Sequence, residues 1–263
     1  MSRRISLAWL ALFALLLTAA TAAAEWPYRT EEAANLPEGH YSLSLGVGRT
    51  DRKTEVRFYS RELLSAPAAV YWSIPEVQGT LGVGSRAEVS FDYEYFLYQL
   101  DDRAGDQYDS GDLRLWTKLG VVRGRRQALS LRFGVKLPNS TYLGTNEADF
   151  YVAGLYDLHL GGWVATANVG LGVLGNPSHN RSQDDLVAWG SSLRWQGEGD
   201  GLRGGVEVAG SNGPHGVERQ RDARLYAGVL GWQWEHWRLD GTLRYGIHDW
   251  EGWGWLAGVT YHR

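Results

Sequence analysis

Apolar and polar residues alternate with a period of two over most of the chain after residue 40. This period places successive side chains on opposite faces of a β-strand, whereas an amphipathic helix repeats every 3.6 residues. The clearest segment, residues 129–137, reads Leu-Ser-Leu-Arg-Phe-Gly-Val-Lys-Leu. The pattern predicts twelve strands at residues 41–47, 74–83, 89–97, 113–121, 129–137, 150–160, 163–173, 187–195, 202–210, 226–234, 237–247 and 253–261.

Strand length and the connections between strands distinguish a membrane barrel from a soluble antiparallel sandwich, which shows the same alternation. Many of the predicted strands run to about ten residues or more, whereas strands in soluble proteins are most often about 5 to 6 residues long. The connections alternate between tight and long, as in outer-membrane barrels, and an even strand number returns both termini to the periplasm. Tight turns are predicted at residues 84–85, 123–126, 161–162, 197–201 and 235–236, and long linkers at 50–73, 99–110, 138–146, 175–184 and 211–221.

Composition supports this class and excludes others. The chain has 263 residues with 34 Gly, 13 Trp and no Cys, so disulfides and thiolate metal sites are excluded. A mean hydropathy of -0.33 excludes a bundle of transmembrane helices. A net charge of -4 argues against a nucleic-acid partner. Glycine within strands suits a sheet that curves shut, and Trp at strand ends, as at Trp163, Trp195, Trp232, Trp234 and Trp237, suits an interfacial girdle.

The first 24 residues have the form of a secretory signal peptide. Two Arg precede an apolar stretch, and small residues lead to Ala22-Ala23-Ala24. We predict a signal peptide at 1–24, a periplasmic segment at 25–39 and an all-β, closed antiparallel transmembrane barrel of about 12 strands at 40–263. The linker 50–73 also alternates in part, so it could add a hairpin. The alternative for residues 1–24 is a membrane anchor, which the short apolar stretch disfavours.

If the apolar positions face lipid, the other positions face the lumen, and many of them are charged. An acidic strand at 88–94 lies beside basic strands at 114–118 and 132–136, with further charges at Asp157, Arg194, Glu207, Asp240 and His248. These charges form either an interstrand ion-pair network that fills a narrow barrel or a selective constriction along a solute path. Trp116 also points inward, which makes it the first candidate for a ligand contact. The predicted lumen-lining residues are Glu88, Asp92, Glu94, Arg114, Trp116, Lys118, Arg132, Lys136, Arg203, Arg238 and Arg244.

Several short motifs resemble a known family. They are Gly-Asp-Leu-Arg-Leu at 111–115, Leu-Arg-Phe-Gly-Val-Lys-Leu-Pro at 131–138, Leu-Gly-Thr at 143–145 and Leu-Pro-Glu-Gly at 36–39. These stretches are similar to the outer-membrane family labelled "MetA-pathway of phenol degradation", whose members are often described as transporters. The resemblance implies an outer-membrane barrel that moves aromatic or other hydrophobic compounds, and it identifies no binding residues.

Three classes of function remain open. The first is a passive outer-membrane transporter or channel for small, aromatic or hydrophobic solutes, with no catalytic residue, cofactor or metal site. The second is a lipid-modifying enzyme, for which Ser178-His179-Asn180 and His248-Asp249 are the only candidates. The third is a structural or adhesive barrel. Expected partners are outer-membrane lipids and lipopolysaccharide, whose phosphates suit the basic residues of the first linker. Direction of flux, oligomeric state and whether residues 25–38 plug the lumen are not predicted.

Overall fold

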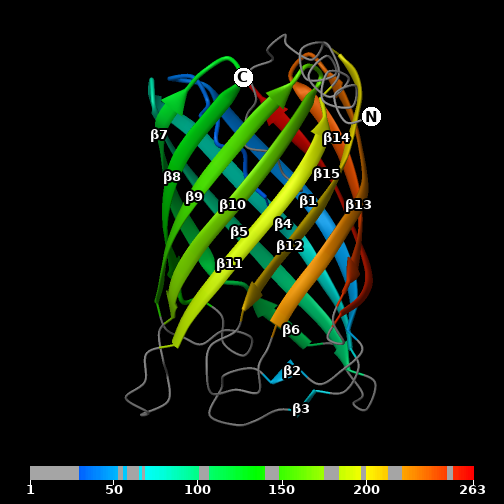
Figure 1. Ribbon diagram of the computed structural model, residues 1–263. Coiled ribbons are helices and arrows are strands. Elements are labelled where there is room, and N and C mark those ends of the chain that lie inside the picture. Colours follow the sequence, from blue (N-terminus) through cyan, green and yellow to red (C-terminus); the bar gives the residue numbers. More distant parts are fainter. Residues whose placement is uncertain are drawn as a thin grey trace, which may run out of the picture.

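The computed structural model describes residues 30–52, 56–57, 65–66, 69–100, 107–139, 148–174, 184–196, 200–212, 221–247 and 251–263. Twelve long antiparallel strands follow one another around a barrel (Figure 1). All twelve predicted strands are confirmed. They are β1 (Tyr41–Arg52), β4 (Ala69–Gly84), β5 (Ala87–Leu100), β7 (Leu113–Arg123), β8 (Gln127–Leu137), β9 (Asp149–Leu160), β10 (Trp163–Leu174), β11 (Asp184–Trp195), β12 (Gly201–Asn212), β13 (Arg221–Trp234), β14 (Trp237–Gly246) and β15 (Glu251–His262).

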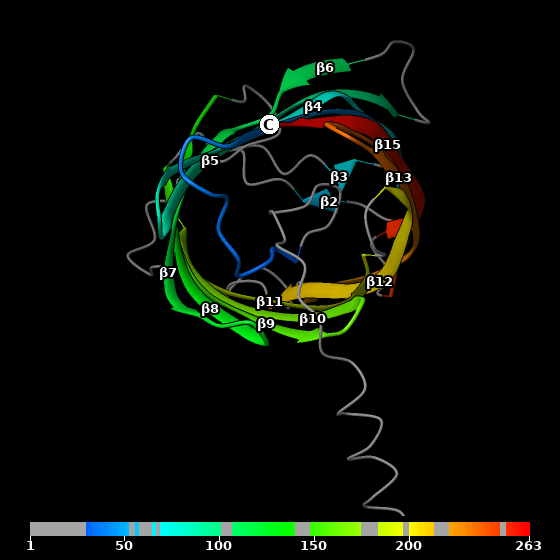
Figure 2. The same ribbon diagram turned by 90° about the horizontal axis from the view of Figure 1, so that it is seen from above.

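The sheet closes because the first and last strands pair. β1 pairs with β15 on one side and with β4 on the other, and each remaining long strand pairs with its neighbours in the chain. Closure leaves no free sheet edge among these strands, which removes the aggregation hazard of long exposed edges. Viewed along the axis, the strands form a ring (Figure 2).

The two ends of the barrel differ. At the end where β1 begins and β15 ends, which we call the turn end, short turns join β4 to β5, β7 to β8, β9 to β10 and β13 to β14. We call the opposite end the loop end. The predicted turn at 197–201 lies largely outside the described residues.

Side chains alternate between the two faces of the wall, as the period of two predicts. On β1, Leu43 and Leu45 are 50% and 52% exposed, whereas Ser42 and Ser44 between them are buried. The same inversion holds round the barrel, where large apolar residues face outward and polar residues face inward. Exposed Trp163, Trp195, Trp232, Trp234 and Trp237 lie near the turn end, where the sequence predicts them. In the part of the chain that the structure describes, no helix is long and apolar enough to cross a membrane.

The first linker differs in part from the sequence pattern. β1 continues to Arg52 and β4 begins at Ala69, so residues 70–72 belong to a barrel strand. Two short strands, β2 (Val56–Arg57) and β3 (Ser65–Ala66), pair with each other and not with the barrel. A further short strand, β6 (Gln107–Ser110), extends the sheet beside β5. The predicted signal peptide, residues 1–24, lies outside the described residues.

Candidate functional site

Residues 30–36, which we call the plug segment, lie inside the barrel. Figure 2 shows this part of the chain within the ring of strands. Its backbone amides donate to buried carboxylates of the wall, from Ala33 N to Asp157 Oδ2 at 2.7 Å and from Leu36 N to Glu88 Oε2 at 2.7 Å. Thr30 N donates to Glu207 Oε1 at 3.0 Å. Since β5, β9 and β12 supply these acceptors, the plug segment crosses the lumen and is attached on several sides.

Two acidic residues of the plug segment pair with basic residues of the wall. Glu31 lies 3.3 Å from Lys118 Nζ and 2.6 Å from Arg132 Nη1. Glu32 lies 3.1 Å from Arg194 Nη1 and is fully buried. Such buried charges are costly unless they are paired, so both carboxylates and their partners depend on the plug segment staying in place.

Lys118 binds both the plug segment and the wall. Its Nζ donates to the backbone carbonyls of Glu32 and Ala34, each at 2.9 Å, and forms an ion pair with Glu88 at 2.8 Å. Only 1% of its side chain is exposed. One ammonium group therefore joins the plug segment to β5 and β7 together.

Glycines make room for the chain inside the barrel. A Cβ at Gly82 would lie 2.1 Å from Pro37 O, and one at Gly120 would lie 2.6 Å from Asn35 Oδ1. The backbones of Gly82 and Gly39 also bond directly, with Gly39 N donating to Gly82 O at 2.9 Å. At these positions glycine serves close approach of the N-terminal chain to the wall as well as curvature of the sheet.

Eight of the predicted lumen residues come together on β5, β7 and β8. The strand register arranges seven of them, all but Glu94, in three parallel rows, which we name from the turn end toward the loop end. Ion pairs cross the first and last rows, so the acidic and basic walls neutralise each other row by row. The turn-side row is Glu88, Lys118, Arg132 and Ala153; the aromatic row is Ser90, Trp116, Gly134 and Tyr151; the loop-side row is Asp92, Arg114, Lys136 and Asp149.

Trp116 is the centre of the aromatic row. Its indole Nε1 donates to Asp92 Oδ1 at 2.6 Å, and the Arg132 guanidinium lies 3.9 Å from the ring centroid. Its ring also lies 5.5 Å from that of Tyr151. A Cβ at Gly134 would lie 2.0 Å from the indole, so the ring occupies the space above that glycine. The inward direction predicted for Trp116 is therefore what the structure shows.

The loop-side row continues the network. Arg114 lies 3.0 Å from Asp92 and 3.9 Å from Glu94, and Lys136 lies 2.8 Å from Asp149. The side chains of Arg114 and Asp92 are 30% and 28% exposed, whereas Lys136 and Asp149 in the same row are buried. In the turn-side row, Glu88 and Lys118 are buried beneath the plug segment.

The other three predicted residues lie elsewhere on the wall. Arg203 is on β12, and Arg238 and Arg244 are on β14, strands that several others separate from β7 and β8 in the sheet. Arg238 is buried and pairs with Asp240 on its own strand at 2.7 Å. The structure does not bring these three together with the eight.

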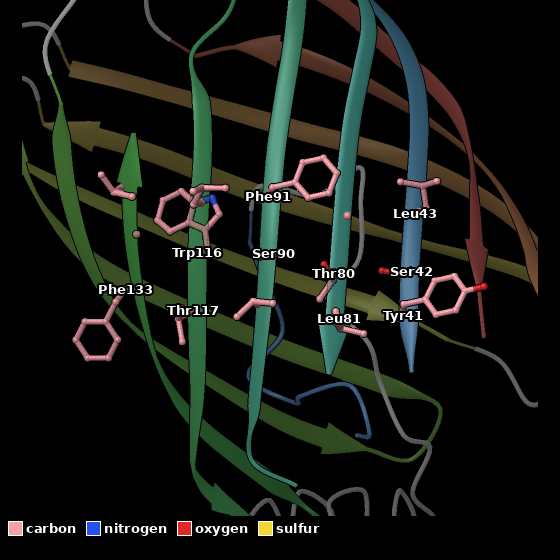
Figure 3. Close-up of a pocket in the computed structure, with 15 residues that line it drawn as sticks. Tyr41, Ser42, Leu43, Thr80, Leu81, Ser90, Phe91, Trp116, Thr117 and Phe133 are labelled. Carbon is pink, nitrogen blue, oxygen red and sulfur yellow. The ribbon is translucent and has the colours of Figure 1, made fainter. Parts of the chain in front are cut away.

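An apolar groove of about 860 Å³ lies over one stretch of the wall, on β1, β4, β5, β7 and β8 (Figure 3). Its exposed lining includes Leu43, Phe91 and Phe133. Residues of the inward parity, such as Ser90 and Trp116, line it as well. The groove therefore borders residues of the aromatic row.

The sequence did not indicate several of these contacts. The sequence analysis left open whether residues 25–38 plug the lumen, and it did not single out Glu31 or Glu32. Tyr151 was also missed, although it has the inward parity. The enzyme candidates at 178–180 and 248–249 lie outside the described residues. Within the described ranges, no group of three or more His, Cys, Asp or Glu residues is placed to hold a metal ion.

Comparison with known proteins places the fold. No protein-family model matches the chain, and no curated protein matches its sequence. The COG4313 outer membrane channel from Pseudomonas putida F1 is similar with a TM-score of 0.64 at 14% identity, over 92% of this chain and 100% of that chain. The chain has the fold of a bacterial outer-membrane β-barrel. The translocator domain of the autotransporter NalP from Neisseria meningitidis is also similar, with a TM-score of 0.52 at 12% identity, over 85% and 88% of the two chains.

In an outer-membrane barrel of this kind, short turns face the periplasm and longer loops face outward. The turn end is then periplasmic, and the plug segment lies in the periplasmic half of the lumen. The family resemblance noted in the sequence stays a prediction because no family model matches.

Proposed function

We propose that the barrel is an outer-membrane channel for small aromatic solutes, closed at its periplasmic side by the plug segment. The observation that carries this proposal is the division of the lumen into two parts. Glu88 and Lys118 of the turn-side row are buried beneath the plug segment, while Trp116 and its partly exposed neighbours Asp92 and Arg114 lie on the loop side. A solute arriving from outside would meet the aromatic row first and the plug segment next.

The contacts between the plug segment and the wall are of a kind that can be displaced. Its contacts to the wall are hydrogen bonds and ion pairs, whereas the apolar cluster that includes Ala33 is small, with only Ala128, Leu155 and Ala153 around it. Polar contacts can be exchanged for contacts with water or with an incoming ligand, unlike a large apolar core. The similar Pseudomonas putida protein is itself an outer membrane channel, which is consistent with this function.

The apolar outer face is proposed to contact the lipids of the membrane. The groove in Figure 3 suggests a second route, in which a solute leaves sideways through the wall beside Ser90 and Gly134. We favour the axial route because the plug segment is attached by groups that an incoming solute can replace. Fixing the plug segment in place separates the two routes, since only axial passage requires it to move.

The test compares the full chain with a variant that lacks residues 25–36 behind an intact signal peptide. In planar bilayers, the full chain should show little stable conductance, and the variant should conduct ions steadily because the turn-side row becomes hydrated. In a porin-deficient host, the full chain should still raise uptake of labelled aromatic solutes above that of cells without it. Two results together would contradict the channel: the shortened variant does not conduct ions, and cells with the full chain take up no more labelled solute than cells without it.

A further inference from the structure

Arg132 connects the plug segment to the aromatic row. Its Nη1 pairs with the Glu31 carboxylate at 2.6 Å, and its guanidinium lies against the Trp116 ring at 3.9 Å. Trp116 in turn donates to Asp92, which pairs with Arg114 at 3.0 Å. Arg132 thus both holds the plug segment and touches the aromatic ring.

The guanidinium of Arg132 is not fully used by Glu31. Its Nε is buried and has no hydrogen-bond partner among the described residues. A planar carboxylate can accept two parallel hydrogen bonds from an Arg side chain, and such bidentate pairs are stronger and better oriented than single ones. A free carboxylate that engages Nη1 and Nε together would therefore compete well with Glu31.

The wall beside Arg132 is built from small side chains. Its cross-strand neighbour on β9 is Ala153, which is followed on β10 by Gly170. In the aromatic row, Tyr151 is followed in the same way by Gly172. Ala153 packs against the cluster that includes Ala33, so a flat ring can lie here, beside the Tyr151 ring, once the plug segment moves away. Aromatic rings pack favourably against such a ring in tilted or offset arrangements.

We propose that this site binds an aromatic carboxylate, with its carboxylate on Arg132 in place of Glu31 and its ring beside Trp116 and Tyr151. Glu31 then occupies the position of the ligand carboxylate on Arg132 when no ligand is bound, and binding of the ligand loosens the plug segment. The inference rests on the proposed function and names the solute class that would open the channel. The present occupant supports the choice of anion, because the site already holds a carboxylate.

The first experiment measures binding by equilibrium dialysis of labelled benzoate against the purified full chain in detergent. Benzoate should bind more tightly than benzyl alcohol by about tenfold, the typical effect of a charge-assisted hydrogen bond. It should also bind more tightly than acetate by roughly two- to tenfold, the usual effect of an aromatic pair. Equal binding of benzoate, benzyl alcohol and acetate would contradict the proposed site for an aromatic carboxylate.

Variants separate this site from non-specific binding. Glu31→Gln removes the internal competitor without altering the barrel wall, so it should tighten benzoate binding, whereas Arg132→Gln should weaken it by at least about tenfold. Trp116→Leu should abolish the preference for benzoate over acetate. The control Arg123→Gln removes an equal charge from an exposed position on β7, where Nη1 donates to Ser85 O, and should leave binding unchanged. If Glu31→Gln does not tighten benzoate binding, the proposed competition between Glu31 and the ligand for Arg132 is contradicted.

The second experiment measures release of the plug segment. The chain contains no Cys, so Ala33→Cys introduces a single thiol at a position that is 1% exposed. Benzoate should accelerate its reaction with a small maleimide, while benzyl alcohol should not. An unchanged rate at saturating benzoate would overturn the coupling. Because both experiments use detergent-solubilised protein, they can fail while uptake of neutral aromatic solutes still supports the channel, and they can succeed in a barrel that transports nothing.

Discussion

Replacing Lys118 with Met should loosen the plug segment by a measurable amount. Lys118 donates two hydrogen bonds to plug carbonyls at 2.9 Å and lies 3.3 Å from Glu31. Hydrogen bonds from a charged donor contribute about 1.5–3 kcal/mol each. Their loss should lower the free energy of opening by about 3 kcal/mol or more, even though Arg132 still holds Glu31.

That energy corresponds to a rise of roughly a hundredfold in the open fraction, at about 1.4 kcal/mol for each factor of ten. The assay is maleimide labelling of Ala33→Cys, whose rate follows the open fraction when the segment recloses faster than it reacts. The matched control is Lys136→Met. Lys136 is also buried on this wall, but its ion pairs go to Asp112 and Asp149 and not to the plug segment.

Retention of heat-modifiable mobility on gels should show that both variants remain folded barrels. Lys118→Met should then label about a hundredfold faster than its parent, while Lys136→Met should label at nearly the parent rate. Equal labelling of the parent and Lys118→Met would refute the role assigned to Lys118 in holding the segment.

Three further predictions concern single contacts. Asp157→Asn should also accelerate labelling at position 33, because Asp157 Oδ2 accepts from the amides of Ala33 and Ala34 at 2.7 and 3.2 Å; the same labelling assay checks it. Gly134→Ala should lower the unfolding temperature because the new methyl group would lie 2.0 Å from the Trp116 ring. Adding Trp116→Ala should restore the unfolding temperature, and a thermal double-mutant cycle measures this coupling. Tyr261→Asp should reduce outer-membrane yield, measured by fractionation, because the Tyr261 ring lies 4.9 Å from the Trp237 ring, between centroids, near the end of β15. Unchanged yield would count against a role of Tyr261 in assembly.

The strands and the direction of the lumen residues could be predicted because they follow from a local rule. In a strand, the parity of a position decides its face, so Arg132 and Lys136 point inward once Leu131 and Phe133 are assigned to the outer face. Trp116 was identified by the same rule. Tyr151 was missed because its neighbours Phe150 and Val152 are also apolar, and an aromatic residue suits either face of such a strand.

The plug segment could not be predicted by any local rule. Residues 30–36 have no regular period, and their partners are distant in the chain; Thr30 and Glu207 are separated by 177 positions. The adjacent acids Glu31 and Glu32 read as an ordinary polar stretch before the first strand. Glycine within strands was attributed in general to curvature, whereas at Gly82 and Gly120 the N-terminal chain passes against the wall. Only the closed barrel brings these groups together.

The central claim is that solutes pass only when the plug segment moves. Ala33 and Ala128 lie in one buried cluster, so cysteines at both positions can be joined by a short reducible cross-linker in a chain without other thiols. The measurement is the initial uptake of labelled benzoate by porin-deficient cells that carry this variant. Uptake should fall to the level of cells without the barrel when the link is closed and recover when it is reduced. Equal uptake in the linked and reduced states would contradict the account.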